Sequence, residues 1–179
     1  MSTLQVENLI GQTSGSNANK IIIPSGQTLD ASNGFVAPAG HVVQVQETFD
    51  LNSNNIAISS NSLTATGIIC SITPKYSNSK ILIDWRSNMA DNPLSYGYGR
   101  MFLKVGSGSY SAMSGTSNYN AGYLNSTQNR YTSLSFSGQY QPTSTDILYF
   151  QPYYLSNANT LTVVHNQSSY SLRLTEIAQ

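Results

Sequence analysis

From about residue 41 onward the sequence is a series of short segments, either apolar throughout or alternating, each bounded by Gly, Pro, Asn or Ser. No long stretch repeats apolar residues at the three- and four-residue spacing of an amphipathic helix. About eight such segments, at roughly 8–12-residue spacing, are typical of an antiparallel sandwich or jelly roll. The sequence therefore predicts an all-β head, an antiparallel β-sandwich or jelly roll, over residues 41–179. The expected strands cover residues 41–49, 63–73, 80–86, 100–105, 130–140, 146–154, 160–166 and 169–177.

Residues 1–40 have a different pattern. Short apolar pieces at residues 4–10 and 20–31 are separated by a run rich in Gly, Ser and Asn. Pieces of this size do not enclose a core, and an isolated two-stranded unit is marginal in water. Three copies packed around an axis would supply the missing partners, so we expect a homotrimer in which this part forms a short extended stalk with an attachment tip. The expected docking residues of the tip are Leu4, Val6, Leu9 and Ile10.

The charge balance narrows the range of partners. Only 9% of residues are charged, and eight basic residues balance eight acidic ones. No basic patch is evident, so we expect no nucleic-acid partner. No apolar run approaches the ~20 residues of a membrane span, and the first residues lack the basic and apolar regions of a secretion signal. We therefore expect no membrane insertion, and a product made in the cytoplasm that reaches the outside by lysis.

Residues with catalytic chemistry are sparse. Cys70, the single cysteine, lies in an Ile-rich segment, which predicts a buried structural thiol. His41 and His165 are far apart in sequence, and zinc sites need clustered Cys and His. Asp84 is expected to pair with Arg86 or Lys80 and not to bind a metal ion. We therefore predict no catalytic residues, no metal, no cofactor and no enzymatic activity.

A Tyr-, Gly- and Ser-rich stretch at residues 91–128 is the least regular part of the predicted head. Loops of this composition on a rigid sandwich are common binding surfaces, because Tyr supplies rigid contact area and Asn supplies amide donors and acceptors. Tyrosines also serve in cores and subunit interfaces, and this second interpretation stays open. The expected receptor-binding residues are Tyr96, Tyr98, Arg100, Tyr119, Tyr123, Asn118 and Asn120.

Four segments carry a resemblance to a known class of proteins. They are MSTLQVENLI at residues 1–10, IPSGQTLD at 23–30, SITPKYSNSKILI at 71–83 and LRLTEIA at 172–178. The chain resembles short tail-fibre-like structural proteins of phages that infect marine or cyanobacterial hosts. This resemblance implies a trimer, an N-terminal part that docks on other tail or capsid proteins of the virion, and a C-terminal globular head.

The sequence thus predicts a bacteriophage virion protein, the subunit of a short trimeric tail fibre or spike, with residues 1–40 as docking segment and stalk. Its head would contact the host surface, with polysaccharide as the candidate receptor. Two alternatives stay open, a capsid head fibre or decoration protein and a free-standing carbohydrate-binding module of lectin type. Self-association separates the virion subunit from the lectin, because a stalk that folds only as a trimer belongs to a particle.

Overall fold

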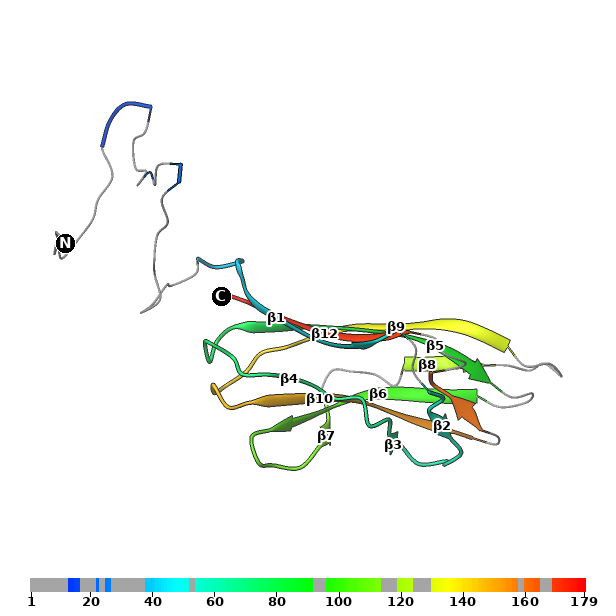
Figure 1. The fold of residues 1–179 in the computed structure, drawn as a ribbon. Coiled ribbons are helices and arrows are strands. Elements are labelled where there is room, and N and C mark those ends of the chain that lie inside the picture. The colour runs from blue at the N-terminus through cyan, green and yellow to red at the C-terminus, as the bar shows by residue number, and fades with distance from the viewer. Residues whose placement is uncertain are drawn as a thin grey trace. The chain divides into compact units, whose positions relative to one another are not determined.

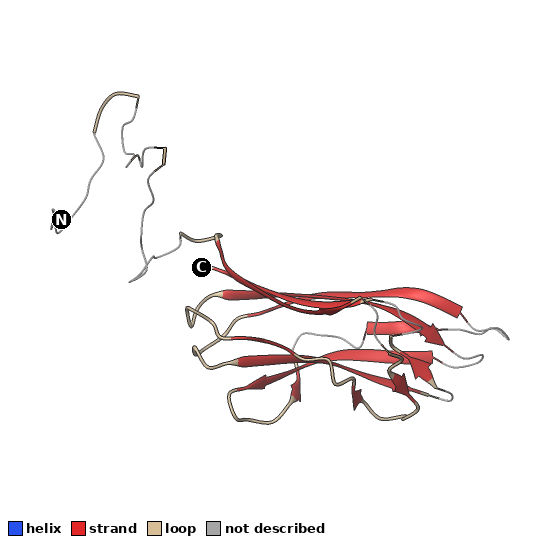
Figure 2. Cartoon of the chain, viewed as in Figure 1, coloured by secondary structure: helices blue, strands red, loops and turns tan. Residues whose placement is uncertain are grey.

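The computed structural model describes residues 13–16, 22, 25–26, 38–51, 54–91, 96–113, 119–123, 130–157, 160–164 and 169–179. The chain divides into two compact units, Met1–Val36 and Ala37–Gln179. The predicted docking residues and most of the predicted stalk lie outside the described residues, so the trimeric stalk stays a prediction. The predicted all-β head is confirmed, because the described residues contain strands and turns but no helix (Figure 2).

The described part of the head contains 12 β-strands. In chain order they are β1 (Val42–Asp50), β2 (Ala57–Ile58), β3 (Thr64–Ala65), β4 (Cys70–Ile72), β5 (Lys80–Asp91), β6 (Tyr96–Val105), β7 (Ser111–Ala112), β8 (Tyr119–Tyr123), β9 (Arg130–Tyr140), β10 (Leu148–Ser156), β11 (Leu161–Thr162) and β12 (Tyr170–Ile177).

The strands form two antiparallel sheets that face each other (Figure 1). In sheet A, β1 pairs with β12, β12 with β5, and β5 with β9 on its other side, while β11 and β2 extend the β12 side of β5. In sheet B, β10 pairs with β3 and β4 on one side and with β6 on the other, and β6 pairs with β7 and β8.

The pairing is that of a jelly roll. When the two-residue strands β2, β3, β7 and β11 are set aside, eight strands remain. The first of them pairs with the last (β1 with β12), the second with the seventh (β4 with β10), the third with the sixth (β5 with β9) and the fourth with the fifth (β6 with β8). This arrangement is one long antiparallel hairpin folded over on itself, the double Greek key of a jelly roll.

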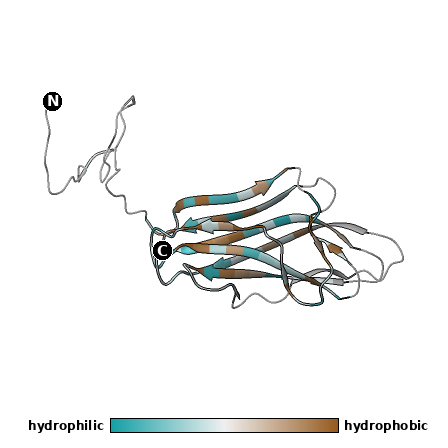
Figure 3. Ribbon diagram, turned by 60° about the horizontal axis from the view of Figure 1, so that its bottom comes forward, coloured by the Kyte–Doolittle hydropathy of each residue, from teal (hydrophilic) through white to brown (hydrophobic). Residues whose placement is uncertain are grey.

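The core lies between the two sheets, where alternate residues of each strand meet. Figure 3 shows hydrophobic and hydrophilic residues alternating along the strands of the sandwich. Trp85 of β5 and Tyr154 of β10 are both fully buried, and the Trp85 indole Nε1–H donates a hydrogen bond of 2.8 Å to the Tyr154 hydroxyl. This bond joins the two sheets through the core. The other largest fully buried side chains are Phe150, Ile72, Ile81, Ile83, Met89, Met101, Leu148, Leu161, Leu172 and Leu174.

One end of the sandwich holds both the start of β1 and the end of the chain (Figure 1). The Gly40 N–H donates to the Ala178 carbonyl at 2.8 Å, and the Ala178 N–H donates to the His41 carbonyl at 2.9 Å. These bonds continue the β1–β12 ladder to the residues that join the head to the N-terminal unit. The start of β6 and β8 lie toward the other end of the sandwich (Figure 1).

A buried carboxylate fixes the β4–β5 turn at the same end. Glu176 of β12 is fully buried. Its oxygens accept hydrogen bonds from the Lys75 N–H at 2.8 Å and the Tyr76 N–H at 3.2 Å, and from the Gln44 amide at 2.6 Å. Glu176 thus ties the turn and the first strand to the last strand, and these donors satisfy a charge that would otherwise be costly to bury.

Four predicted strands needed correction. The strand expected at residues 80–86 continues as β5 to Asp91. The strand expected at residues 63–73 is broken into β3 and β4, because Gly67 adopts a positive φ of 81° and the Thr66 hydroxyl bonds the Pro152 carbonyl. β6 begins at Tyr96 and not at Arg100, so it enters the stretch expected to be irregular. In the segment expected at residues 160–166, only β11 is a strand among the described residues.

Candidate functional site

The structure places most of the predicted receptor-binding residues on two neighbouring strands of sheet B. Tyr96, Tyr98 and Arg100 lie on β6, and Tyr119, Asn120 and Tyr123 lie on β8. In the register, Tyr96 faces Tyr123 and Tyr98 faces Asn120. The tyrosines and Asn120 were expected in loops and lie on strands instead, whereas Arg100 lies on a strand as expected, and the proximity of the group was predicted. Asn118 lies outside the described residues, and of the β8 side chains and Tyr96 only the backbone positions are described.

Tyr98 and Arg100 belong to a longer row on the outer face of sheet B. The β6 residues Met101 and Leu103 are buried in the core, so the alternate positions Tyr98, Arg100, Phe102 and Lys104 face outward.

The neighbouring strand β10 adds its own outward row beside them. Tyr149 lies opposite Lys104, and Tyr153 lies opposite Arg100. The Phe102 and Tyr153 rings stack with centroids 3.9 Å apart and planes at 21°. We call the set Tyr98, Arg100, Phe102, Lys104, Tyr149 and Tyr153 the aromatic face.

The cations of the aromatic face lie against its rings. The Lys104 ammonium is 4.0 Å from the Tyr149 ring centroid and 5.4 Å from that of Tyr110, which follows the β6–β7 turn. Such contacts are worth ~0.5–2 kcal/mol, depending on desolvation. Burial raises the pKa of the Tyr110 hydroxyl, and that hydroxyl and Arg100 Nε are buried without a hydrogen-bond partner.

The aromatic face is half-buried and not fully open. All six of its side chains are of intermediate exposure, and Gln151 between them is only 5% exposed. The rings thus form a rigid surface whose edges and upper faces are accessible. Rigid aromatic area with adjacent amide and cationic groups suits recognition of a sugar ring, in which C–H groups stack and hydroxyls accept hydrogen bonds.

Sequence reasoning missed four residues of this face: Phe102, Lys104, Tyr149 and Tyr153. The signal was present, because Phe102 and Lys104 follow Tyr98 and Arg100 at the two-residue period of a strand. The position of Tyr149 and Tyr153 beside them depends on the β6–β10 register, which the sequence does not reveal.

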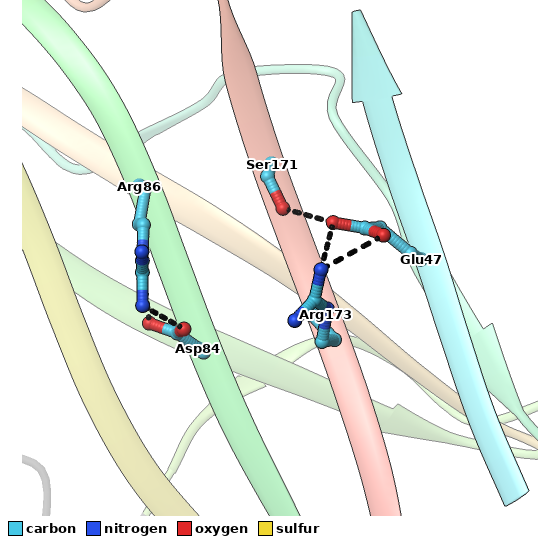
Figure 4. Close-up of polar contacts among 5 residues, drawn as sticks. All are labelled: Glu47, Asp84, Arg86, Ser171 and Arg173. Carbon is cyan, nitrogen blue, oxygen red and sulfur yellow. Dashed lines mark hydrogen bonds and ion pairs between the residues drawn. The ribbon is translucent and has the colours of Figure 1, made fainter.

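The outer face of sheet A has different chemistry (Figure 4). Its centre carries two ion pairs on neighbouring strands. Arg86 binds Asp84 of the same strand at 2.9 Å, as the sequence predicted, and Arg173 of β12 binds Glu47 of β1 at 3.2 Å. A shallow hollow of about 1040 Å³ lies over this face, lined in part by Asp84, Arg86, Arg173, Leu82, Ser135 and Ser137.

On this outer face, the Glu47 carboxylate accepts hydrogen bonds from two residues, Ser171 and Arg173. The Ser171 hydroxyl donates to Glu47 Oε1 at 2.5 Å, and the Arg173 guanidinium reaches both of its oxygens. These contacts lower the pKa of the Glu47 carboxyl below its usual value of 4.5, and the hydrogen bond from Ser171 contributes most to this shift. The charge of Glu47 is thus compensated within its own chain.

The residues weighed for catalysis and metal binding are dispersed. Cys70 is 2% exposed, as predicted, and burial raises the pKa of its thiol. His41 is exposed just before β1, and His165 lies outside the described residues. Within the described ranges, no group of three or more His, Cys, Asp and Glu side chains is placed to hold a metal ion. No helix long and apolar enough to cross a membrane occurs in the part of the chain that the structure describes.

Comparisons with known proteins give little to set beside this geometry. No protein-family model matches the chain, and no curated protein sequence does. Among solved structures, a chain in the structure of infectious bursal disease virus Gx strain is similar at 11% sequence identity and a TM-score of 0.32. The match covers 87% of this chain and 47% of that chain, so this chain spans about half the length of its counterpart. A likeness with so low a TM-score carries no argument about function.

Proposed function

We propose that this protein is a structural subunit of a bacteriophage particle, a short trimeric fibre or spike that docks through its N-terminal residues and presents the jelly-roll head outward. The observation that carries the proposal is the eight-strand double Greek key joined at one end to a separate N-terminal unit. Jelly rolls of this kind occur in viral capsid and lectin domains. Surfaces of the head that the trimer does not bury are then available for contact.

The aromatic face is the proposed contact for host-surface polysaccharide. Tyr98 and Tyr149 offer ring faces, and Arg100 and Lys104 add charged donors between them. Such contacts are individually weak, and three heads on one stalk would raise the apparent affinity through avidity. Tyr98 lies near the start of β6, and the start of β6 lies at the end of the sandwich opposite to the start of β1 (Figure 1).

The test of the particle assignment uses purified virions and the purified chain. Native mass spectrometry of the chain is expected to show a trimer, and electron microscopy of the virion is expected to show the head projecting from the tail or capsid. Deletion of residues 1–15 is expected to leave a folded trimer that no longer joins the particle. A chain that is monomeric and absent from the virion would contradict the proposal and favour a free lectin.

The test of the aromatic face compares single substitutions. Tyr98→Ala and Tyr149→Ala are expected to weaken adsorption to host cells at least about 10-fold. Each substitution removes a ring from all three heads, so avidity multiplies the loss of affinity. The matched control is Tyr76→Ala, which removes a half-exposed tyrosine of the β4–β5 turn that does not belong to the aromatic face. Equal adsorption of all three variants would refute the assignment of this face.

A further inference from the structure

Strand β1 turns its apolar side outward and its polar side inward, the reverse of the usual arrangement in a sandwich. Val45, Glu47 and Phe49 lie on the outer face, in register with Thr175, Arg173 and Ser171. The residues between them point the other way, toward the edge of sheet B.

There the Thr48 hydroxyl donates to the Ile69 carbonyl at 2.9 Å, and the Gln44 amide donates to the Thr73 carbonyl at 2.7 Å. A strand at the edge of a single soluble sandwich normally turns its apolar side inward. β1 does the opposite, so its apolar side is exposed on the outer face of sheet A.

The apolar side chains of this strand are well exposed. Val42 is 59% exposed, Val45 50%, Phe49 60% and the adjoining Leu51 72%. Among the described residues they make up half of the large hydrophobic side chains that are exposed to this degree, the others being Ile22, Ile69, Leu82 and Val105. Exposed apolar residues gathered along one strand mark an interaction surface more often than scattered ones do.

β1 is also an edge strand without the usual protection. Among the described strands it pairs only with β12, so one side of its backbone has no strand beside it. Edge strands are commonly protected by Lys, Pro or bulges in the exposed part. The sequence of β1, VVQVQETFD, contains neither Lys nor Pro, and its one irregularity lies at its start, between Val42 and Gln44.

The other edge of sheet A provides the contrast. On β9 the outward positions are polar, with exposed Ser133, Ser135, Ser137 and Gln139. The two edges of the same sheet thus differ in chemistry, and only the β1 edge has the composition of a buried interface.

The charge on the β1 side does not oppose burial. Glu47, the acidic residue between Val45 and Phe49, is paired with Arg173 and hydrogen-bonded to Ser171. An interface formed here would bury the ion pair of Glu47 and Arg173. Burial of a single unpaired charge would cost more.

We infer that β1 packs against a second copy of this chain in the head of the oligomer, with Val45 and Phe49 of β1 and the adjoining Leu51 in the contact. The inference rests on the proposed trimer and says which surface of the head forms it. Chain connectivity favours this partner, because β1 is the first strand after residues 1–40, and three chains joined through that segment bring their β1 strands close together. A strand of this length, ~30 Å at ~3.3 Å per residue, is long enough to contribute to an interface of about 800 Å² per partner.

The experiment measures the mass of the full chain by sedimentation and native mass spectrometry over a range of concentrations. Phe49→Lys places a charge in the inferred interface, and Ser62→Lys places the same charge on an exposed position between β2 and β3, away from the outer face of sheet A. Phe49→Lys is expected to raise the concentration for half-dissociation at least about 30-fold, while Ser62→Lys stays within about 3-fold of the wild type. Fluorescence of Trp85, the single tryptophan, reports whether each variant remains folded.

A measurement on the unaltered protein covers the case in which Phe49→Lys fails to fold. Hydroxyl-radical footprinting of the native oligomer is expected to leave Phe49 protected, although it is 60% exposed in the single chain. A trimer in which Phe49 is readily oxidised, or in which folded Phe49→Lys associates as the wild type does, would overturn this inference and leave the trimer standing. A wild-type chain that is monomeric at all concentrations would overturn both.

Discussion

Replacing Tyr154 by Phe tests whether the hydrogen bond between the two sheets stabilises the head. The substitution keeps the ring in the core and removes the oxygen that accepts the Trp85 Nε1–H at 2.8 Å. Both side chains are fully buried, so water does not replace the lost partner without rearrangement. A buried donor left unpaired costs about 1–3 kcal/mol, and we expect a decrease of that size in the free energy of unfolding.

The assay is urea unfolding followed by tryptophan fluorescence at one protein concentration, since association would make the midpoint depend on concentration. With a slope of about 2 kcal/mol per molar urea, the expected loss lowers the midpoint by about 0.5–1.5 M. The matched control is Tyr153→Phe, the neighbouring residue on the outer face, whose hydroxyl loss should cost no more than about 0.5 kcal/mol. If Tyr154→Phe and the control unfold at the same midpoint, the argument that this bond joins the sheets is refuted.

Three further substitutions test other contacts. Glu176→Gln keeps an amide oxygen that still accepts the Lys75 N–H but loses the charge and the second acceptor, so that its NH₂ group meets the Gln44 amide. We expect a loss of about 1–3 kcal/mol in urea unfolding, and an unchanged midpoint would contradict the role of Glu176. Because the folded state lowers the pKa of Glu47 below 4.5, its stabilisation is present above that pH and is lost as the pH falls through the lowered pKa. The stability difference between wild type and Glu47→Gln should therefore be largest near neutral pH and vanish in acid, and a pH-independent difference would count against it. Cys70→Ser places a hydroxyl in an apolar site and should cost about 1–3 kcal/mol without changing adsorption, so a variant that adsorbs poorly while remaining folded would disprove the purely structural role.

The strands with strong alternation were predictable from the sequence. β9 runs from Arg130 to Tyr140, as predicted, because Leu134, Phe136 and Tyr140 alternate with polar residues over most of its length. β12 and β1 were predicted within one residue at each end. The two-residue strands β2 and β7 and the strand β8 were missed, because their pairing arises from neighbours distant in sequence and not from their own composition.

The candidate surfaces were predictable only in part. The proximity of Tyr98 to the other tyrosines was expected from their density, but the aromatic face extends to Tyr149 and Tyr153 through a register set by tertiary structure. The reversed sides of β1 could not be read from the alternation of Val45, Glu47 and Phe49, since periodicity shows that a strand has two faces and not which of them is turned inward.

The joining of the N-terminal unit to the head through β1 has a mechanical consequence. β1 is held to β12 by a ladder of antiparallel bonds that runs from Val42 to Asp50 and continues through His41 and Ala178. Because these bonds lie perpendicular to the strand, a pull on residue 41 along the strand axis loads them all in shear at once. A pull across the axis would instead open them one after another, beginning at Gly40. The head is therefore built to resist tension along one direction, that of its first strand.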